Sequence, residues 1–191
     1  MISNLNSFER LTAEPVESVV LLDTDGRAIG TADKAKIHTD RTPLHSAFSI
    51  FLFNRNGQML AQQRAWSKPT WPGIWSNACC GHPAPGEALL SAAERRLEQE
   101  LGLTDISLKI ALPRFRYRAE YLGIVENEIC PVFVGACERD PILNSEEVAD
   151  FKWIDWQAFC GAANTSGERE HPFQHFSPWS LLEARALAGL G

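Results

Sequence analysis

The sequence has little of what would direct a chain of 191 residues to a membrane or a nucleic acid. Its uninterrupted apolar stretches, such as residues 19–22 and 50–53, are far shorter than the roughly 20 residues of a membrane helix. It has no run rich in Lys and Arg, and its net charge is −6, so we expect neither nucleic acid nor a membrane as a partner. Any phosphate that the protein binds must be held by local cations.

The cysteines lack the number and spacing of common structural frameworks. The five cysteines are odd in number and form no CxxC pair, which argues against a disulfide framework and a zinc finger. The first 20 residues include Glu9, Glu14 and Glu17 and lack the pattern of a secretory signal or a targeting peptide. Because free thiols fit a reducing compartment, we expect a cytoplasmic protein.

The composition and patterning predict an α+β protein. Hydrophobic residues make up 45% of the chain and charged residues 22%, as in ordinary globular proteins, and the length suits a single domain over residues 1–191. Apolar and β-branched runs predict strands at residues 18–22, 47–53, 58–64, 115–119, 128–136 and 147–154. A turn at residues 54–57 joins two of them in a hairpin.

Two helices and two loops complete the expected architecture. Apolar residues recur at helical spacing over residues 86–101, and Gly102 follows as a stop. Ser177 and Pro178 form an N-cap and first turn for a helix over residues 177–187. Residues 65–78, rich in Trp, Pro and Gly, predict a packed loop over a site, and residues 161–167 predict a loop of small residues. The sequence thus favours a mixed β-sheet flanked by helices.

A motif associated with diphosphate binding starts at a glycine and runs through the predicted helix. Its members, at fixed spacing, are Gly81, Glu87, Arg95, Leu97, Glu100 and Gly102. The pattern resembles the Nudix box, the loop–helix–loop signature of proteins that bind diphosphates through a divalent cation. Arg96 and Gln99 depart from it, because Nudix hydrolases carry glutamates of the hydrolytic metal cluster at these positions.

Glu100 has two interpretations. It lies in the last helical turn, where the helix dipole disfavours a carboxylate by about 0.3–1 kcal/mol. An ion pair with Arg96 at i,i+4, worth about 0.2–0.5 kcal/mol, would offset that cost. Alternatively, Glu100 binds Mg²⁺ together with substrate phosphates, which is how Mg²⁺ is commonly held in proteins. The spacing of the box favours the magnesium ligand.

Three further segments restrict the resemblance to one family of Nudix proteins. They are Asn77-Ala78-Cys79-Cys80-Gly81-His82-Pro83, Glu126-Asn127-Glu128-Ile129-Cys130-Pro131-Val132-Phe133 and Ser177-Pro178-Trp179. Together with the box, they are similar to the type I isopentenyl-diphosphate isomerases, a Nudix-fold family of isoprenoid biosynthesis. The resemblance covers about residues 18–160 and the Ser-Pro-Trp segment. It implies reversible conversion of isopentenyl diphosphate into dimethylallyl diphosphate through a tertiary carbocation.

The resemblance implies a divalent metal site. Glu126 and Glu128 would project to one face of a strand, where they repel each other unless a cation or proton lies between them. A solvated strand face is the alternative, although apolar flanks argue against it, and a lone histidine is more often a surface or hydrogen-bonded residue. The implied ligands for Mn²⁺, Zn²⁺ or Mg²⁺ are His38, His45, His82, Glu126 and Glu128.

The resemblance also implies the catalytic groups. Cys80 is the candidate thiol, and a nearby cation would lower its pKa. Cys79 is its rival, but adjacent extended residues point to opposite sides, and the family pattern selects Cys80. Glu128, helped by Tyr117, is assigned the proton donor, and Trp179 the indole that stabilises the carbocation.

The diphosphate requires cations, for which the resemblance implies Lys34, Arg64, Lys68 and Arg96, with Mg²⁺ on Glu100. For the two lysines an ordinary surface position is the alternative. The expected partner is a small-molecule diphosphate, and the expected state is a monomer or weak dimer.

Two other functions compete with isomerisation. A Nudix hydrolase of a nucleoside diphosphate derivative fits the box but not Arg96 and Gln99. A Nudix-fold binding module without turnover would have no use for Cys80, His82 and the two strand glutamates.

Overall fold

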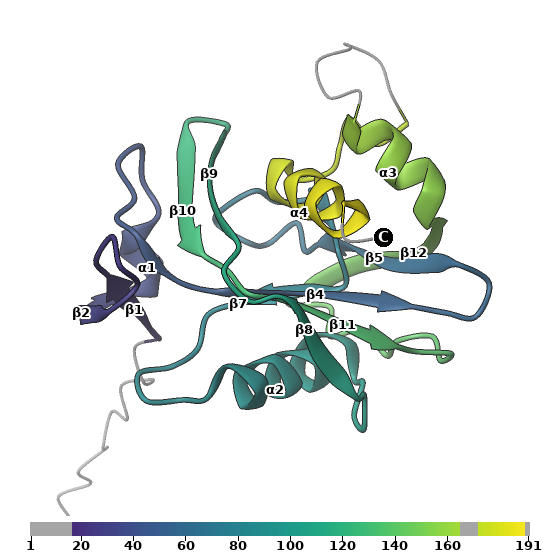
Figure 1. The fold of residues 1–191 in the computed structure, drawn as a ribbon, viewed down its shortest axis with the longest axis horizontal. Helices are drawn as coiled ribbons and strands as arrows, with labels where there is room; N and C mark the ends of the chain where they lie inside the picture. Colours follow the sequence, from purple (N-terminus) through teal and green to yellow (C-terminus); the bar gives the residue numbers. More distant parts are fainter. Residues whose placement is uncertain (1–16, 165–171, 190–191) are drawn as a thin grey trace, which may run out of the picture.

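The computed structural model describes residues 17–164 and 172–189. These residues form two β-sheets and four helices, which confirms the α+β class (Figure 1). None of the described helices combines the length and apolar character needed to cross a membrane.

The larger sheet has seven strands and contains the predicted hairpin. Its main path is β12 (Val148–Asp155), β5 (Gln58–Arg64), β4 (Phe48–Phe53), β11 (Val132–Ala136) and β8 (Leu108–Leu112), with β6 (Trp75–Ser76) on β5 and β7 (Cys79–Gly81) on β4. Asn54 closes the turn between β4 and β5, since its Oδ1 accepts from the amides of Asn56 and Gln58. The strands predicted at 47–53, 58–64 and 147–154 are confirmed to within one residue at each end.

The smaller sheet has five strands, in the order β2 (Ala28–Asp33), β1 (Ser18–Leu22), β3 (His45–Ser46), β10 (Ile124–Ile129) and β9 (Arg116–Tyr121). The prediction of a single strand over residues 128–136 is wrong. The chain leaves this sheet after Ile129 and enters the larger sheet at Val132. Pro131 explains the break, because it lacks the N–H that a continuous ladder would use.

Helices cover both faces of the larger sheet (Figure 1). On one face, α2 (Leu89–Leu101) buries Ala93 and Leu97 against Phe48, Ile50 and Phe133. It begins three residues later than predicted, after Ala88, and ends at Gly102 in the left-handed conformation, as expected.

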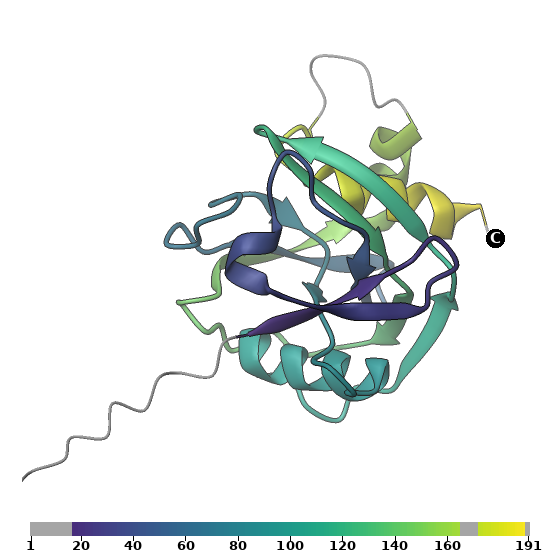
Figure 2. The ribbon, with the colours of Figure 1, turned by 90° about the vertical axis from the view of Figure 1, so that its left-hand side faces the viewer.

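On the other face, α3 (Trp156–Asn164) and α4 (Pro178–Ala188) pack over Phe51 and Met59. The predicted loop at 161–167 is wrong for residues 161–164, which continue α3, because Ala163 is buried in this core. Residues 165–167 lie outside the described residues. Ser177 caps α4 as predicted, its Oγ accepting from the amide of Ser180. The short α1 (Lys34–Ile37) follows β2 (Figure 2).

Candidate active site

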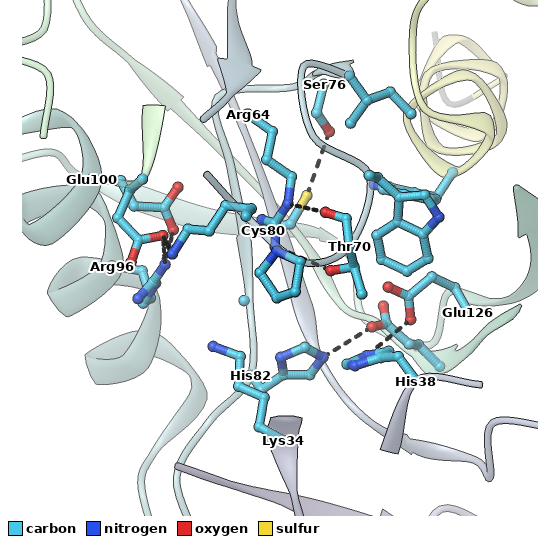
Figure 3. A pocket seen from close by; sticks show the side chains of 18 of the residues that line it. Lys34, His38, Arg64, Thr70, Ser76, Cys80, His82, Arg96, Glu100 and Glu126 are labelled. Carbon is cyan, nitrogen blue, oxygen red and sulfur yellow. Dashed lines mark hydrogen bonds and ion pairs between the residues drawn. The ribbon is translucent and has the colours of Figure 1, made fainter. Parts of the chain in front are cut away.

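A cavity of about 570 Å³ is lined by residues from both sheets, α2 and α4. It brings together residues that are far apart in the sequence (Figure 3). All but one of the residues expected from the sequence line it, namely Lys34, His38, Arg64, Lys68, Cys80, His82, Arg96, Glu100, Tyr117, Glu126, Glu128 and Trp179. His45, the exception, is fully buried.

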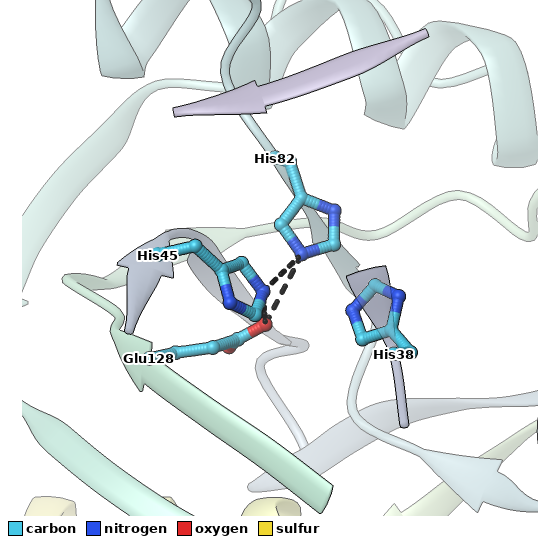
Figure 4. Close-up of side chains that lie close together, drawn as sticks. All are labelled: His38, His45, His82 and Glu128. Carbon is cyan, nitrogen blue, oxygen red and sulfur yellow. Dashed lines mark hydrogen bonds and ion pairs between the residues drawn. The ribbon is translucent and has the colours of Figure 1, made fainter. Parts of the chain in front are cut away.

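Three histidines and a carboxylate converge at one end of the cavity. Ligand atoms of His38, His45, His82 and Glu128 all lie within 4.8 Å of one another (Figure 4). Strand pairing sets part of this geometry, because His45 on β3 and Glu128 on β10 are register partners. Glu128 Oε1 lies 3.3 Å from His45 Nε2 and 3.2 Å from His82 Nε2.

Glu126 lies at the side of this cluster. Its Oε2 is 3.4 Å from His38 Nε2 and 3.9 Å from His45 Nε2. Both Glu126 Oε2 and His38 Nε2 are buried without a hydrogen-bond partner among the described residues. Buried polar atoms without partners are costly, and a cation bound between them would remove that cost.

The protonation states of the cluster suit metal ligands. Burial lowers the pKa of His38 and of His82 to about 4, so both rings are neutral at pH 7. His45 Nδ1 lies 2.9 Å from the Pro43 carbonyl and donates to it, which directs Nε2 toward the cluster. Burial opposes the charged form of His45, but the hydrogen bond to Glu128 outweighs it and raises the pKa of this ring, and a bound cation would take the place of the Nε2 proton.

The pKa values of the two strand glutamates, Glu126 and Glu128, are shifted in opposite directions. Burial opposes ionisation of Glu128, but hydrogen bonds from His45 and His82 outweigh it and hold the pKa well below its usual range. Burial, followed by the charge of Glu128, raises the pKa of Glu126. Only one of the two carboxyls therefore ionises readily without a cation, and the donor set of imidazoles and carboxylates fits Mn²⁺, Zn²⁺ or Mg²⁺.

The two adjacent cysteines face opposite sides of β7, as predicted. Cys79 is fully buried in the core under α2, whereas Cys80 lines the cavity. Cys80 Sγ lies 3.2 Å from Asn77 Oδ1 and 3.3 Å from Ser49 Oγ. Burial, together with the negative charge that the nearby Glu183 carries once it is ionised, raises the pKa of the Cys80 thiol, opposite in direction to the predicted lowering. The thiol is therefore protonated at neutral pH, and its thiolate is a strong base.

Tyr117 and Trp179 complete the apolar side of the cavity. Tyr117 faces Glu128 across the β9–β10 pair, and its hydroxyl donates to Glu128 Oε2 at 2.7 Å. Trp179 lies in the first turn of α4, and its ring meets that of Trp71 edge-on at a centroid distance of 5.0 Å. Trp71 is held in turn by a hydrogen bond from its Nε1 to the Tyr121 carbonyl.

The cationic end of the cavity is lined with ion pairs. Arg96 Nε donates to Glu100 Oε1 at 2.9 Å, which is the i,i+4 pair considered above. Both residues also line the cavity. Lys68 Nζ lies 2.7 Å from Glu147, which also contacts Arg96 at 3.2 Å. Lys34 pairs with Glu17 at 2.7 Å, and Arg64 Nε donates to the Thr70 carbonyl.

The loop before α2 is fixed by its own contacts. Arg95 holds Glu87 through two hydrogen bonds of 2.7 Å, and Glu87 Oε2 also accepts from the amide of Ala84. A side chain at Gly81 would bring a Cβ within 2.9 Å of the Phe48 ring and 3.2 Å of Arg96 Cγ. This position therefore requires glycine for the close approach of β7, β4 and α2.

Sequence reasoning did not single out Glu147, which lines the cavity, or Ser49 and Glu183, which are linked to Cys80. Glu147 stands at the edge of a predicted strand, where nothing distinguishes it from a solvated carboxylate. Ser49 sits within an apolar strand, and Glu183 lies four residues after Trp179, on the same side of α4. The helical spacing from Trp179 was a usable signal for Glu183.

The fold and the box-bearing loop and helix, with carboxylates and cations around one cavity, define a Nudix protein. The family model of the NUDIX domain matches residues 43–176. Two crystal structures share the fold. One, from Deinococcus radiodurans, has a TM-score of 0.66 at 16% identity and covers 90% of this chain and 99% of its own. A MutT protein from Methanosarcina mazei has a TM-score of 0.60 at 17% identity and covers 78% and 95%.

Curated relatives show which group of Nudix proteins the chain belongs to. An isopentenyl-diphosphate Delta-isomerase of Saccharopolyspora erythraea is 51% identical over 92% of this chain and 88% of its own length. A protein of the same name from Mycolicibacterium vanbaalenii is 48% identical over 93% and 96%. The chain belongs to the isopentenyl-diphosphate Delta-isomerase family of Nudix proteins.

Proposed function

We propose that this protein interconverts isopentenyl diphosphate and dimethylallyl diphosphate, the reaction that the names of its relatives indicate. One observation carries the proposal. A single cavity contains a thiol, a carboxyl bonded to a tyrosine, an indole ring and a group of cations. These are the parts that an acid–base rearrangement of an alkene diphosphate requires.

The chemistry is a 1,3 proton shift. In the resting protein Glu128 is ionised and Cys80 carries the proton, so the reactive form is the one in which the proton sits on Glu128 and Cys80 is a thiolate. Glu128, with the hydrogen bond from Tyr117, gives this proton to the terminal CH₂ of isopentenyl diphosphate, and a tertiary carbocation forms at the next carbon. Cys80 then takes a proton from the CH₂ next to the diphosphate-bearing carbon. The C–H bond breaks, an S–H bond forms, and the electron pair becomes the new double bond. In the reverse direction the two residues exchange roles.

The carbocation needs stabilisation that does not quench it. Trp179 is 7% exposed and offers an indole face in the cavity. A desolvated cation on such a face gains about 2 kcal/mol. Because Trp71 packs against Trp179, the ring position is fixed and water is excluded from that side.

Lys34, Arg64, Lys68 and Arg96 bind the diphosphate, with Mg²⁺ on Glu100. Without substrate, Glu17 and Glu147 pair with these cations. Phosphate oxygens would compete with the two carboxylates for the same donors.

His38, His45, His82, Glu126 and Glu128 hold one divalent ion, Mn²⁺, Zn²⁺ or Mg²⁺. When bound, the ion supplies positive charge that lets both strand carboxylates remain buried. Three broader expectations accompany the proposal: a single domain over residues 1–191, a monomer or weak dimer, and a cytoplasmic location. The free state of all five cysteines supports the last of these.

Hydrolysis of a nucleoside diphosphate derivative is the competing function. The two positions that would need glutamates are occupied otherwise: Arg96 pairs with Glu100, and Gln99 Oε1 accepts from Arg95.

The test is incubation of the protein with isopentenyl diphosphate and Mg²⁺, with the Cys80→Ala variant as control. We expect dimethylallyl diphosphate without released phosphate, and no isomer from the control. Release of phosphate or diphosphate without isomer would select a hydrolase.

A further inference from the structure

A buried carboxyl group lies close to Cys80, linked to it through one serine. Glu183 on α4 is 0% exposed, and its Oε1 accepts from Ser49 Oγ at 2.6 Å. Cys130 Sγ also donates a hydrogen bond to this oxygen, at 3.7 Å. Glu183 Oε2 has no hydrogen-bond partner among the described residues. Such a group is costly to bury, so its retention calls for an explanation.

Ser49 connects this carboxyl to the catalytic thiol. It pairs with Cys80 in the β4–β7 register, and its Oγ lies 3.3 Å from Cys80 Sγ. A serine hydroxyl has one hydrogen to donate. Because Ser49 gives it to Glu183 Oε1, the hydroxyl can offer Cys80 only a lone pair. This holds whether Glu183 is ionised or carries a proton on Oε2.

The other close neighbour of the sulfur is also an acceptor. Asn77 Nδ2 donates to the carbonyls of Ile50 and Cys79, which fixes the orientation of the amide. Asn77 Oδ1 therefore faces Cys80, 3.2 Å from Sγ. A second hydroxyl, Ser76 Oγ, lies farther from the sulfur, at 3.9 Å, and gives its own hydrogen to Asn77 Oδ1 (Figure 3). All three contacts of the sulfur thus accept a hydrogen, and none donates one.

We propose that Glu183 is a positioning residue for the isomerisation, which acts through Ser49 to keep hydrogen-bond donors away from the Cys80 sulfur. A thiolate without donors is a stronger base toward the carbocation, and the single hydrogen of the S–H group formed when it takes the proton finds an acceptor in Asn77 Oδ1 or Ser49 Oγ. This inference rests on the proposed isomerase activity. It adds a residue that touches neither the substrate cavity nor the metal cluster.

Three variants test the chain of contacts. Glu183→Met removes the acceptor at similar length, so the Ser49 hydroxyl becomes free to donate to the sulfur. We expect kcat to fall about tenfold while KM stays within about twofold, because only the proton transfer is affected. Glu183→Gln keeps an acceptor oxygen facing Ser49 and Cys130 and should restore kcat to within about threefold of wild type.

Ser49→Ala in the Glu183→Met background should recover most of the lost kcat, since the hydroxyl that would donate to the sulfur is then absent. Leu182→Met, a similar change at a partly exposed neighbouring position of α4, is the matched control and should leave kcat unchanged. Wild-type kcat in Glu183→Met, equal losses in the Gln and Met variants, or no recovery of kcat when Ser49→Ala is added to Glu183→Met would each overturn the inference.

An infrared measurement tests the same contact without activity. The S–H stretching band of Cys80, isolated by subtracting the spectrum of Cys80→Ala, should shift in Glu183→Met and keep its position in Glu183→Gln. A band unmoved in Glu183→Met would overturn the inference even if the protein isomerises isopentenyl diphosphate. Conversely, an inactive wild-type protein with a shifted band would overturn the proposed function alone.

Discussion

The buried carboxyl of Glu183 should make the stability of the protein depend on pH in a defined direction. Burial is the largest influence and raises the pKa of Glu183 from its ordinary value of 4.5 to about 8. The unfolded chain thus loses this proton at lower pH than the folded protein does. The contribution of the group to stability is fully present below about pH 4.5 and is lost as the pH rises through about 8.

The size of the effect follows from the gap between the two pKa values. It corresponds to about 5 kcal/mol in the free energy of unfolding, accumulating by about 1.4 kcal/mol per pH unit. Glu183→Gln cannot ionise and removes this dependence. The difference in unfolding free energy between the variant and wild type should therefore rise in favour of the variant from about pH 4.5 to about pH 8.

Urea unfolding followed by circular dichroism, at a series of pH values for both proteins, measures this difference. Glu94→Gln, which removes an exposed carboxyl from α2, is the control and should show no comparable trend. A difference between the Glu183 variant and wild type that stays constant across this pH range would refute the assignment of a buried, protonated Glu183.

Substitutions at three cavity residues, Cys80, Arg96 and Trp179, give further tests. Cys80→Ala should abolish isomerisation with little loss of substrate binding, while Cys79→Ala, on the core side of β7, should keep substantial activity; equal losses in steady-state assays would contradict the choice of thiol. Arg96→Glu should raise KM, because it removes a contact to phosphate and adds a repelling charge, and an unchanged KM would mean that Arg96 serves only the helix. Trp179→Phe should keep partial activity, and Trp179→Leu should lose far more kcat at similar KM. Melting curves recorded beside the kinetics separate this from lost packing, and equal kcat in the two Trp179 variants would exclude a cation–π role.

Local signals in the sequence predicted the elements that depend on local chemistry. The turn after β4, the glycine that ends α2 and the serine cap of α4 all follow from short-range hydrogen bonding and backbone preferences. The break at Pro131 was visible in the sequence but was overridden by the apolar residues on both sides. The end of α3 was missed because small residues favour a loop in isolation, whereas here they allow a helix to pack on α4.

The residues of the candidate site also fall into two groups: those that short sequence segments predict and those that only the fold brings together. The box and the family segments predicted the residues around the cavity, because these residues are marked by type and spacing. The pairing of His45 with Glu128 comes from strand register, which no short segment encodes. Glu147 and Glu183 were missed for a related reason: a carboxylate becomes notable only when the fold buries it beside a cation or a thiol.

The most direct test of the account is the fate of solvent hydrogen during turnover. Wild-type protein equilibrated in D₂O is incubated with isopentenyl diphosphate and Mg²⁺, and the products are followed by NMR. If side-chain acids protonate the alkene and side-chain bases remove a different proton, the dimethylallyl diphosphate formed will carry deuterium in its new methyl group, with no phosphate released. Dimethylallyl diphosphate without deuterium, or release of phosphate in its place, would contradict the account.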